Sequence, residues 1–340
     1  MKGRFIIGIA ILISTALQAQ DPVFSQYYNS EVYLNPAMIG EEADVYLNYA
    51  HRSQWRNLDY PYTTHQLSLI IPYYKNKHKV PESHVGSFGV SFYTDQAGEG
   101  RNLKTTGGNI SYAYDLQLNE TQVFAFALQA GFIQKAVDKN QLQWGEQYNQ
   151  FVGFDNSIVP ADLNQIENRM FLDMTMGAFW RYYAANETDK LYSLYAGAVA
   201  SHFNNPDESV LAGEVNKLPT LFKFHYGMVY SLNHNTFISG NMIHLMQNNE
   251  YQHNFGAFLS RMLPFETRGK LTNLVGRVGT WYRFGDAFIF SAELITDHFQ
   301  VGFSYDFNDG SLRYNNRGTG SYEITLGYRF HNPAPPKVRY

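Results

Sequence analysis

Four histidines and one serine are the residues whose types could support metal binding or hydrolysis. His225, His234, His244 and His253 fall on successive hairpin-like stretches, but no two of them have a ligand-like local spacing with a carboxylate. Ser239 and His244 could act as nucleophile and base, yet serine and histidine are frequent enough here for such a pair to arise by chance. We therefore interpret the histidines as lumen or interface residues, where water and hydrogen bonds suit the imidazole ring.

Short catalytic motifs are missing from the sequence. It contains no Walker loop, no GxSxG elbow and no HExxH helix, and the nearest glycine cluster, Gly98-Glu99-Gly100, fits no phosphate-binding motif. Cysteine is absent, which excludes disulfides and thiolate metal sites. We expect a protein that is not an enzyme, with no catalytic residues, no cofactor and no metal site.

The composition points to a membrane barrel rather than to a bundle of apolar helices. Of the 340 residues, 16% are aromatic and only 16% are charged, well below the usual quarter, while the mean hydropathy is −0.35. This combination suits a barrel, in which apolar residues occupy alternate positions. The net charge of −4 gives no reason to expect a nucleic acid as a partner.

The first 19 residues are typical of a secretory signal peptide. Lys2 and Arg4 supply the positive start, an apolar run follows, and the small residue Ala19 suits cleavage directly after it. That run is too short for a membrane span, and no later stretch reaches about 18 uninterrupted apolar residues. Because only helices and closed barrels satisfy every backbone polar group in lipid, a membrane protein with this sequence must be a barrel.

The end of the chain shows the strand pattern most clearly. One face of the extended segment carries Tyr322, Ile324, Leu326, Tyr328 and Phe330, and the opposite face carries Glu323, Thr325, Gly327 and Arg329. Because a basic residue facing lipid near the midplane costs about 2–4 kcal/mol, the aromatic face should contact lipid and the charged face the lumen. We therefore expect arginine to impair assembly at Ile324 and to be better tolerated at Thr325.

Similar alternation recurs along the chain and predicts an all-β fold, a transmembrane antiparallel outer-membrane β-barrel of about 14 strands spanning residues 43–331, with a Pro-rich tail at 332–340. The expected strands are 45–50, 66–71, 87–92, 109–118, 124–132, 171–183, 191–201, 221–232, 236–246, 251–262, 274–284, 287–295, 300–307 and 322–330. The alternative, a soluble β-sandwich or propeller, would need buried hydroxyl partners for many tyrosines.

Connection lengths suggest how the barrel is oriented. Short turns are expected on the periplasmic side, at 119–120, 185–189 and 233–234. Long loops are expected on the outer side, at 137–167, 203–218 and 308–319. Two connections fit less well, since 73–83 is long for a periplasmic turn and 285–286 is short for an outer loop. The sequence therefore predicts 14 strands, with a count that differs by two as the alternative.

Residues 20–42 form an irregular lead-in, because two prolines and an Asn-Pro step oppose regular structure. This segment either docks a partner or plugs the lumen, or it merely closes the structure before the first strand. We favour partial plugging, since a barrel of this size has a lumen too wide for its wall residues to fill. Trp55, Trp180 and Trp281 are candidates for interfacial belts, although Trp55 could instead fold the first outer loop inward.

The opening of the chain also resembles a known family. The similarity rests on Asp21, Pro22, Phe24, Ser25, Gln26, Tyr27, Asn35, Pro36, Ala37, Gly40, Arg52, Ser53, Gln54 and Trp55, and near the end on Val301 to Asp306, including Tyr305, and on Gly320 to Ile324, including Glu323. These residues resemble the PorP/SprF family, outer-membrane components of the type IX secretion system of Bacteroidota. They are structural or docking candidates.

The resemblance implies an outer-membrane protein that works by binding. One kind of member associates with periplasmic and peptidoglycan-linked subunits of the secretion machine, and the other displays an adhesin, as in gliding, by receiving its C-terminal domain. The resemblance does not choose between these partners. The alternative function is an outer-membrane diffusion channel or hydrophobic-solute transporter.

Overall fold

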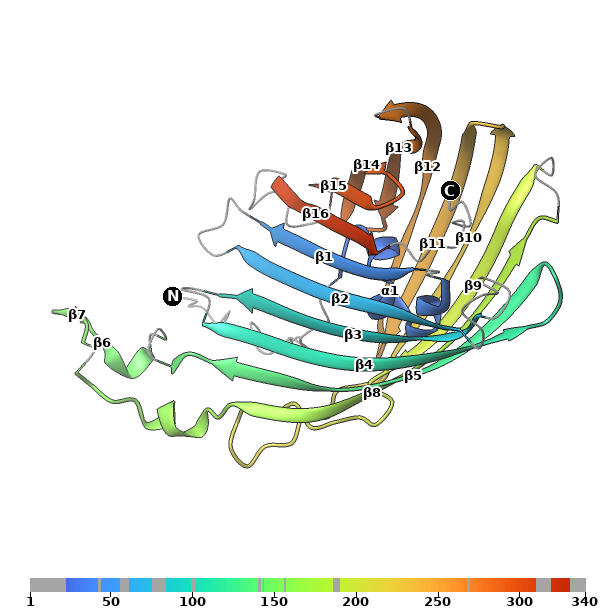
Figure 1. The fold of residues 1–340 in the computed structure, drawn as a ribbon. Helices are drawn as coiled ribbons and strands as arrows, with labels where there is room; N and C mark the ends of the chain where they lie inside the picture. Colours follow the sequence, from blue (N-terminus) through green and yellow to red (C-terminus); the bar gives the residue numbers. More distant parts are fainter. Residues whose placement is uncertain are drawn as a thin grey trace, which may run out of the picture.

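The structure is a computed structural model, and it describes residues 23–41, 44–55, 61–74, 84–98, 102–139, 142, 144–155, 157–185, 190–267, 270–309 and 319–330. The expected signal peptide and C-terminal tail lie outside the described residues, as do Asp21 and Pro22. Within the described part, fourteen antiparallel strands close into a barrel (Figure 1). The prediction of an all-β barrel of about 14 strands is confirmed.

The barrel strands are β1 (Val45–Gln54), β2 (Tyr62–Tyr74), β3 (His84–Ala97), β4 (Leu103–Gln117), β5 (Gln122–Val137), β8 (Arg169–Tyr183), β9 (Leu191–Ser201), β10 (Leu221–Asn233), β11 (Thr236–Gln247), β12 (Glu250–Thr267), β13 (Lys270–Arg283), β14 (Ala287–Ile295), β15 (Phe299–Asn308) and β16 (Thr319–Phe330). Each pairs with its neighbours in sequence, and β1 closes the ring by pairing with β16. Closure leaves no sheet edge exposed to lipid, so the strands satisfy each other's backbone groups.

Two further groups of short elements complete the described chain. Before β1 lie η1 (Tyr27–Asn29), α1 (Glu31–Leu34) and η2 (Pro36–Glu41). The loop between β5 and β8 holds η5 (Gly145–Gln147), β6 (Tyr148–Asn149), β7 (Gly153–Phe154) and η6 (Ala161–Gln165). No helix in the described part of the chain is long and apolar enough to cross a membrane.

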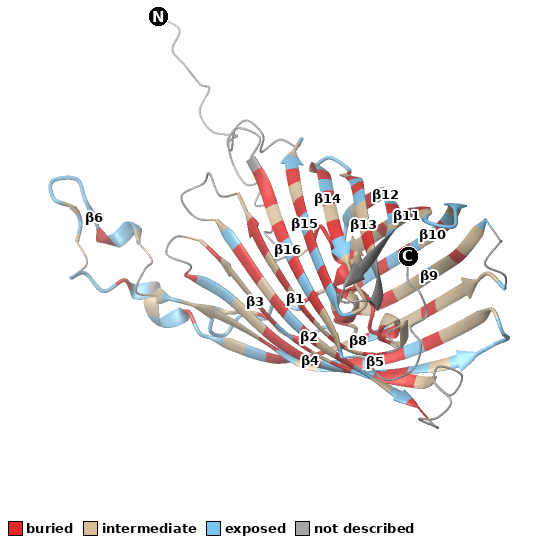
Figure 2. Cartoon of the chain, turned by 45° about the horizontal axis from the view of Figure 1, so that its top comes forward, coloured by how far each residue is buried: buried red, intermediate tan, exposed pale blue. Residues whose placement is uncertain are grey.

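Burial alternates along the strands as the sequence predicted. On β16, Ile324 and Leu326 are 36% and 46% exposed, whereas Glu323 and Thr325 are 0% and 1% exposed. Figure 2 shows the same banding of buried and exposed residues on many strands. The apolar face therefore points out of the barrel, and the polar face points into the lumen.

The observed strands are longer than several of those predicted. β2 begins at Tyr62 rather than at 66, because the polar residues Thr63 and Thr64, on opposite faces of the strand and both buried, interrupt the apolar alternation without ending the strand. The short connection at 285–286 is a real hairpin between β13 and β14, since Gly285 adopts φ 69° and the Asp286 N–H donates to the Arg283 carbonyl at 3.1 Å. It therefore does not change the strand count.

The two ends of the barrel are named here from the predicted orientation. The outer end carries the long loops 138–168 and 202–220, and the periplasmic end carries the first residue of β1 and the last residue of β16.

The outward face generates a prediction about depth. Replacing Ile324, at the middle of β16, with arginine should cost about 2–4 kcal/mol, whereas Phe330→Arg at the periplasmic end should cost about 0–1 kcal/mol. Unfolding by urea in lipid vesicles, followed by the heat-dependent gel shift of the folded barrel, measures both. Equal costs for the two variants would contradict the assignment of the lipid-facing surface.

Candidate functional site

The lead-in lies inside the ring of strands (Figure 1). Its described part, residues 23–41, is folded into three short helical turns, and Gln26, Val32, Asn35 and Ile39 are all fully buried. The turns are short because Asn35 must be extended before Pro36, with φ −153° and ψ 113°, which ends α1. A chain this irregular has few internal hydrogen bonds, so its polar groups must find partners on the barrel wall.

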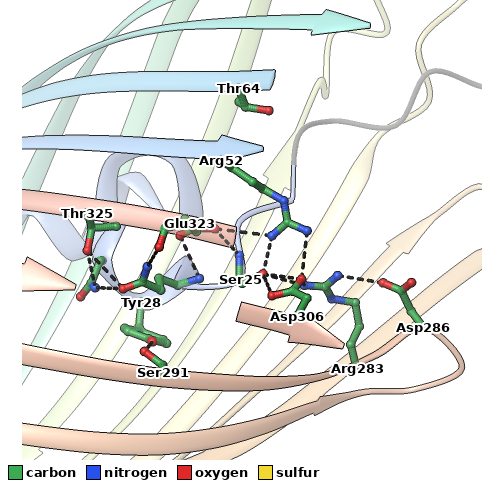
Figure 3. A network of polar contacts seen from close by, with 12 residues as sticks. Ser25, Tyr28, Arg52, Thr64, Arg283, Asp286, Ser291, Asp306, Glu323 and Thr325 are labelled. Carbon is green, nitrogen blue, oxygen red and sulfur yellow. Dashed lines mark hydrogen bonds and ion pairs between the residues drawn. The ribbon is translucent and has the colours of Figure 1, made fainter. Parts of the chain in front are cut away.

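One group of partners lies near the outer end and is called the outer polar cluster. It consists of Ser25, Arg52, Arg283, Asp306 and Glu323 (Figure 3). The Ser25 hydroxyl donates to the two carboxylate oxygens of Asp306 at 2.7 and 2.8 Å, and it accepts from Arg52 and, at 3.1 Å, from Arg283. Asp306 therefore sits between two guanidinium groups, at 3.1 Å from Arg52 and 3.2 Å from Arg283.

Glu323 holds the backbone of the lead-in rather than a side chain. Its two carboxylate oxygens accept the N–H of Ser25 at 2.7 Å and the N–H of Gln26 at 3.0 Å. The Gln26 amide in turn donates to the Glu323 carbonyl at 3.2 Å. Gly302 makes room for this contact, because a Cβ there would lie 2.3 Å from the Gln26 side-chain oxygen.

A second group of partners surrounds Asn29, closer to the periplasmic end. Asn29 donates to Glu293 at 3.1 Å and accepts from Gln300 at 2.8 Å and from Arg277 at 3.2 Å. Arg277 and Glu293 are themselves an ion pair at 2.6 Å. The lead-in thus supplies one amide that hydrogen-bonds three polar side chains of the lumen wall, from β13, β14 and β15.

Aromatic stacking also holds the lead-in against β13 and β14. The Tyr28 ring stacks on Trp281 with centroids 5.2 Å apart, and its hydroxyl lies 3.1 Å from that of Ser291. Trp281 is 1% exposed and faces the lumen, which corrects the interpretation of this residue as part of an interfacial belt.

The Asn35-Pro36-Ala37 step is anchored on the opposite wall. The Asn35 side-chain oxygen accepts the Ala37 N–H at 2.9 Å, and its amide donates to the Ala178 carbonyl at 3.0 Å and to His225 at 2.9 Å. Glycine is required beside it, because a Cβ on Gly177 would lie 2.2 Å from the Asn35 oxygen. His225 is therefore a hydrogen-bond partner of the lead-in.

The last turn of the lead-in is held near the periplasmic end. Glu41 pairs with Arg181 of β8, and Gly40 packs so closely against β4 that a Cβ there would lie 2.3 Å from the Asp115 carboxylate. Since Ser25 lies near the outer end and Glu41 near the periplasmic end, the lead-in crosses the lumen.

Most residues singled out from the sequence meet in this region. The structure brings Ser25, Gln26, Arg52, Asp306 and Glu323 into mutual contact, and it buries Phe24, Tyr27, Asn35, Pro36 and Ala37 in the lead-in. Three others point elsewhere. Trp55 packs edge to face on Tyr62, with ring centroids 5.1 Å apart. Tyr305 packs on Phe307 on the outer surface, with centroids 4.7 Å apart, and Gln54 is partly exposed at the end of β1.

Two functional contacts were missed from the sequence. Nothing in the sequence linked Arg283 to Ser25, although the Arg283 guanidinium donates to the Ser25 hydroxyl at 3.1 Å across 258 residues of sequence. Thr325 was expected to tolerate arginine better than Ile324 does, because it faces the lumen. It is 1% exposed and donates to Gln26 at 3.2 Å, so the lead-in leaves no space for a larger side chain there.

The residues considered for catalysis or metal binding are not arranged for either. Ser239 is buried on the lumen side of β11, whereas His244 points outward, where its ring nitrogen lies 2.6 Å from that of His253. Within the described residues, no group of three or more His, Cys, Asp or Glu side chains could hold a metal ion.

Comparisons with known proteins identify a family. A family model described as "Type IX secretion system membrane protein PorP/SprF" matches residues 16–328, and no curated protein matches the sequence. Among solved structures, the chain is similar to the CymD monoaromatic hydrocarbon channel, at 14% identity and a TM-score of 0.48, over 89% of this chain and 93% of that one. It is also similar to the P. putida toluene transporter TodX, at 10% identity and a TM-score of 0.44, over 87% and 93%. A third similar structure is BamA from Haemophilus ducreyi lacking POTRA domains 1–3. Its sequence identity is 10% and its TM-score is 0.39, over 84% of this chain and 70% of that one.

The outer polar cluster generates a prediction about the lead-in. Asp306→Ala removes the carboxylate that two buried guanidinium groups and the Ser25 hydroxyl share. Among the described carboxylates, Arg52 then keeps only Glu323, at 3.5 Å, and Arg283 only Asp286, so the docking of residues 23–41 should weaken by about 3 kcal/mol. Hydrogen exchange of the Ser25 and Gln26 amides should accelerate at least a hundredfold. The control Glu214→Ala removes an equal charge from an exposed outer loop and should leave this exchange unchanged. Equal protection in both variants would show that the cluster does not hold the lead-in.

Proposed function

Because the chain belongs to the PorP/SprF family of type IX secretion system membrane proteins, we propose that it is a non-enzymatic outer-membrane component that binds subunits of the secretion machine or anchors a secreted adhesin through the adhesin's C-terminal domain. The family match bears out the resemblance seen in the opening residues. The protein is an outer-membrane β-barrel, and its family implies interaction with the secretion machinery.

The observation that supports a binding role most strongly is the anchored lead-in. It crosses the lumen and is held by buried charges at the outer end and by an ion pair near the periplasmic end. Opening the lumen would take the hydrogen bonds of the lead-in away from Asp306 and Glu323, which is costly because both carboxylates are buried. A barrel built in this way suits a fixed membrane anchor that presents its loops and rims to other proteins.

The alternative function, passage of an apolar solute, has one observation in its favour. Two cavities of about 40 and 80 Å³ adjoin the lead-in near the outer end, and both are lined by Val23, Leu221 and Leu245. Their joint size suits at most a small apolar group. The strand residues that line the cavities come from the outer parts of β10, β11 and β12, so the cavities support binding of such a group more directly than its transport across the barrel.

Recovery of partners from the native membrane tests the proposed function. A tagged protein, extracted in mild detergent from native outer membranes, should retain either peptidoglycan-linked secretion subunits or one large adhesin. The first result would assign it to the core machine, and the second to surface display. Recovery of neither, from membranes that secrete normally, would contradict the proposal.

Conductance distinguishes the anchor from the channel. In planar bilayers the wild-type barrel should show no stable conductance, because residues 23–41 occupy the lumen. A variant lacking residues 23–41 should conduct, provided that the heat-dependent gel shift confirms a folded barrel. A large, steady conductance from the wild-type protein would favour the channel instead.

A further inference from the structure

The loop between β5 and β8 carries a small hairpin that stands apart from the barrel. β6 and β7 pair through Tyr148 with Phe154 and Asn149 with Gly153. Both views place this hairpin away from the wall and beyond the ends of β4 and β5 (Figures 1 and 2). It therefore lies outside the layer in which apolar side chains of the strands face lipid.

The hairpin is held in shape by its own contacts. Tyr148 and Phe154 pack edge to face with centroids 5.4 Å apart, and the Asn149 side chain accepts the Phe151 N–H at 2.9 Å. The Gln147 amide donates to the Ile158 carbonyl at 3.0 Å, and Glu146 accepts the Ala161 N–H at 3.0 Å. These contacts hold the shape of the tip before any partner arrives, which lowers the entropy cost of binding.

The tip exposes apolar side chains to an unusual degree. Phe151 is 85% exposed, Val152 is 78% exposed, and Val159 nearby is 73% exposed. Lipid explains the exposure of Ile324 and similar residues on the strands, but it does not explain exposure beyond the strand ends. Clustered apolar exposure of this kind marks an interaction site.

The negative charge of the loop around the tip indicates which kind of partner surface would bind it. Residues 140–168 include Glu146, Asp155, Asp162 and Glu167, and they contain no lysine, arginine or histidine. The hydroxyl and N–H of Ser157 hold the pKa of Asp155 below its usual value, so that carboxylate remains charged. An anionic lipid surface would repel this loop, whereas a basic protein surface would attract it.

We propose that this hairpin tip is a docking element, and that its partner is a secreted protein presenting an apolar groove bordered by lysine or arginine. Phe151 and Val152 enter the groove as the buried anchor, and the surrounding carboxylates meet the basic border. The proposal rests on the proposed function, because it names the part of the barrel that a displayed protein contacts.

Two double variants test the anchor. Phe151→Ser with Val152→Ser removes the apolar tip but keeps the Tyr148–Phe154 contact and the Asn149 hydrogen bond to the backbone. Leu211→Ser with Val215→Ser makes the same chemical change in the loop between β9 and β10, where these residues are 48% and 70% exposed. Retention of the secreted protein per folded barrel, after mild detergent extraction of native outer membranes, should fall at least tenfold for the first and stay unchanged for the second.

The charge requirement has its own measurement. Raising NaCl from 150 to 500 mM should release the secreted protein from the wild type, and the variant Glu146→Gln with Asp155→Asn should show a weaker salt dependence. Glutamine and asparagine preserve the hydrogen-bond acceptors at these positions, so the fold of the loop is kept. If the double variant showed the same salt dependence as the wild type, the proposed lysine or arginine border of the partner's groove would be wrong.

The remaining outcomes separate this proposal from the one it rests on. If the wild type retains no secreted protein, the display role fails, and the docking element fails with it. If the wild type and the Phe151/Val152 variant retain the protein equally, only the docking element fails. Sedimentation of the nanodisc-embedded barrel with phosphatidylcholine or phosphatidylglycerol vesicles covers a membrane role. Tip-dependent binding to vesicles, together with unchanged protein retention, would assign the tip to a lipid surface instead.

Discussion

The pairing of Asp306 with two guanidinium groups and the Ser25 hydroxyl is the interaction on which the rest of the lumen depends. Arg52 and Arg283 project from β1 and β13, and both are about 3 Å from the same carboxylate. Charges buried at a barrel wall need partners of opposite sign and further hydrogen bonds. The charged side chains all belong to the barrel wall, and the lead-in provides their remaining hydrogen-bond partners. The polar groups of the wall and of the lead-in therefore depend on each other for a full set of hydrogen bonds.

This dependence explains why an irregular segment can be well ordered. The lead-in has little helix to stabilise it, and its backbone relies on Glu323 at one point and on side chains such as Lys223 and Gln129 at others. These contacts come from strands far apart around the ring, so the lead-in also ties distant strands together. A lumen occupied in this way leaves the rims and loops as the surfaces available to a partner.

The strands could be predicted from sequence because the lipid and the lumen impose opposite chemistry on alternate residues. On β16 that contrast is sharp from Glu323 to Leu326, and the predicted sides of Ile324 and Thr325 are the observed ones. The contacts across the lumen could not be predicted, since they join residues such as Ser25 and Arg283 that no local pattern relates. Ser25, Arg52, Asp306 and Glu323 were found only through the family resemblance. Trp281 was misassigned because a tryptophan near a strand end suits either an interface or a filled lumen.

In this fold, the position of an exposed apolar residue relative to the membrane determines whether lipid or water surrounds it. Leu326 and Phe151 are both exposed, but Leu326 lies on β16 within the ring, whereas Phe151 lies between β6 and β7, a hairpin that stands beyond the ends of the barrel strands (Figure 1). Lipid covers the first without any further partner, whereas water surrounds the second. The acidic residues of the same loop would be repelled by an anionic lipid surface. A protein surface with an apolar groove and a basic border matches both the apolar tip of the loop and its negative charge.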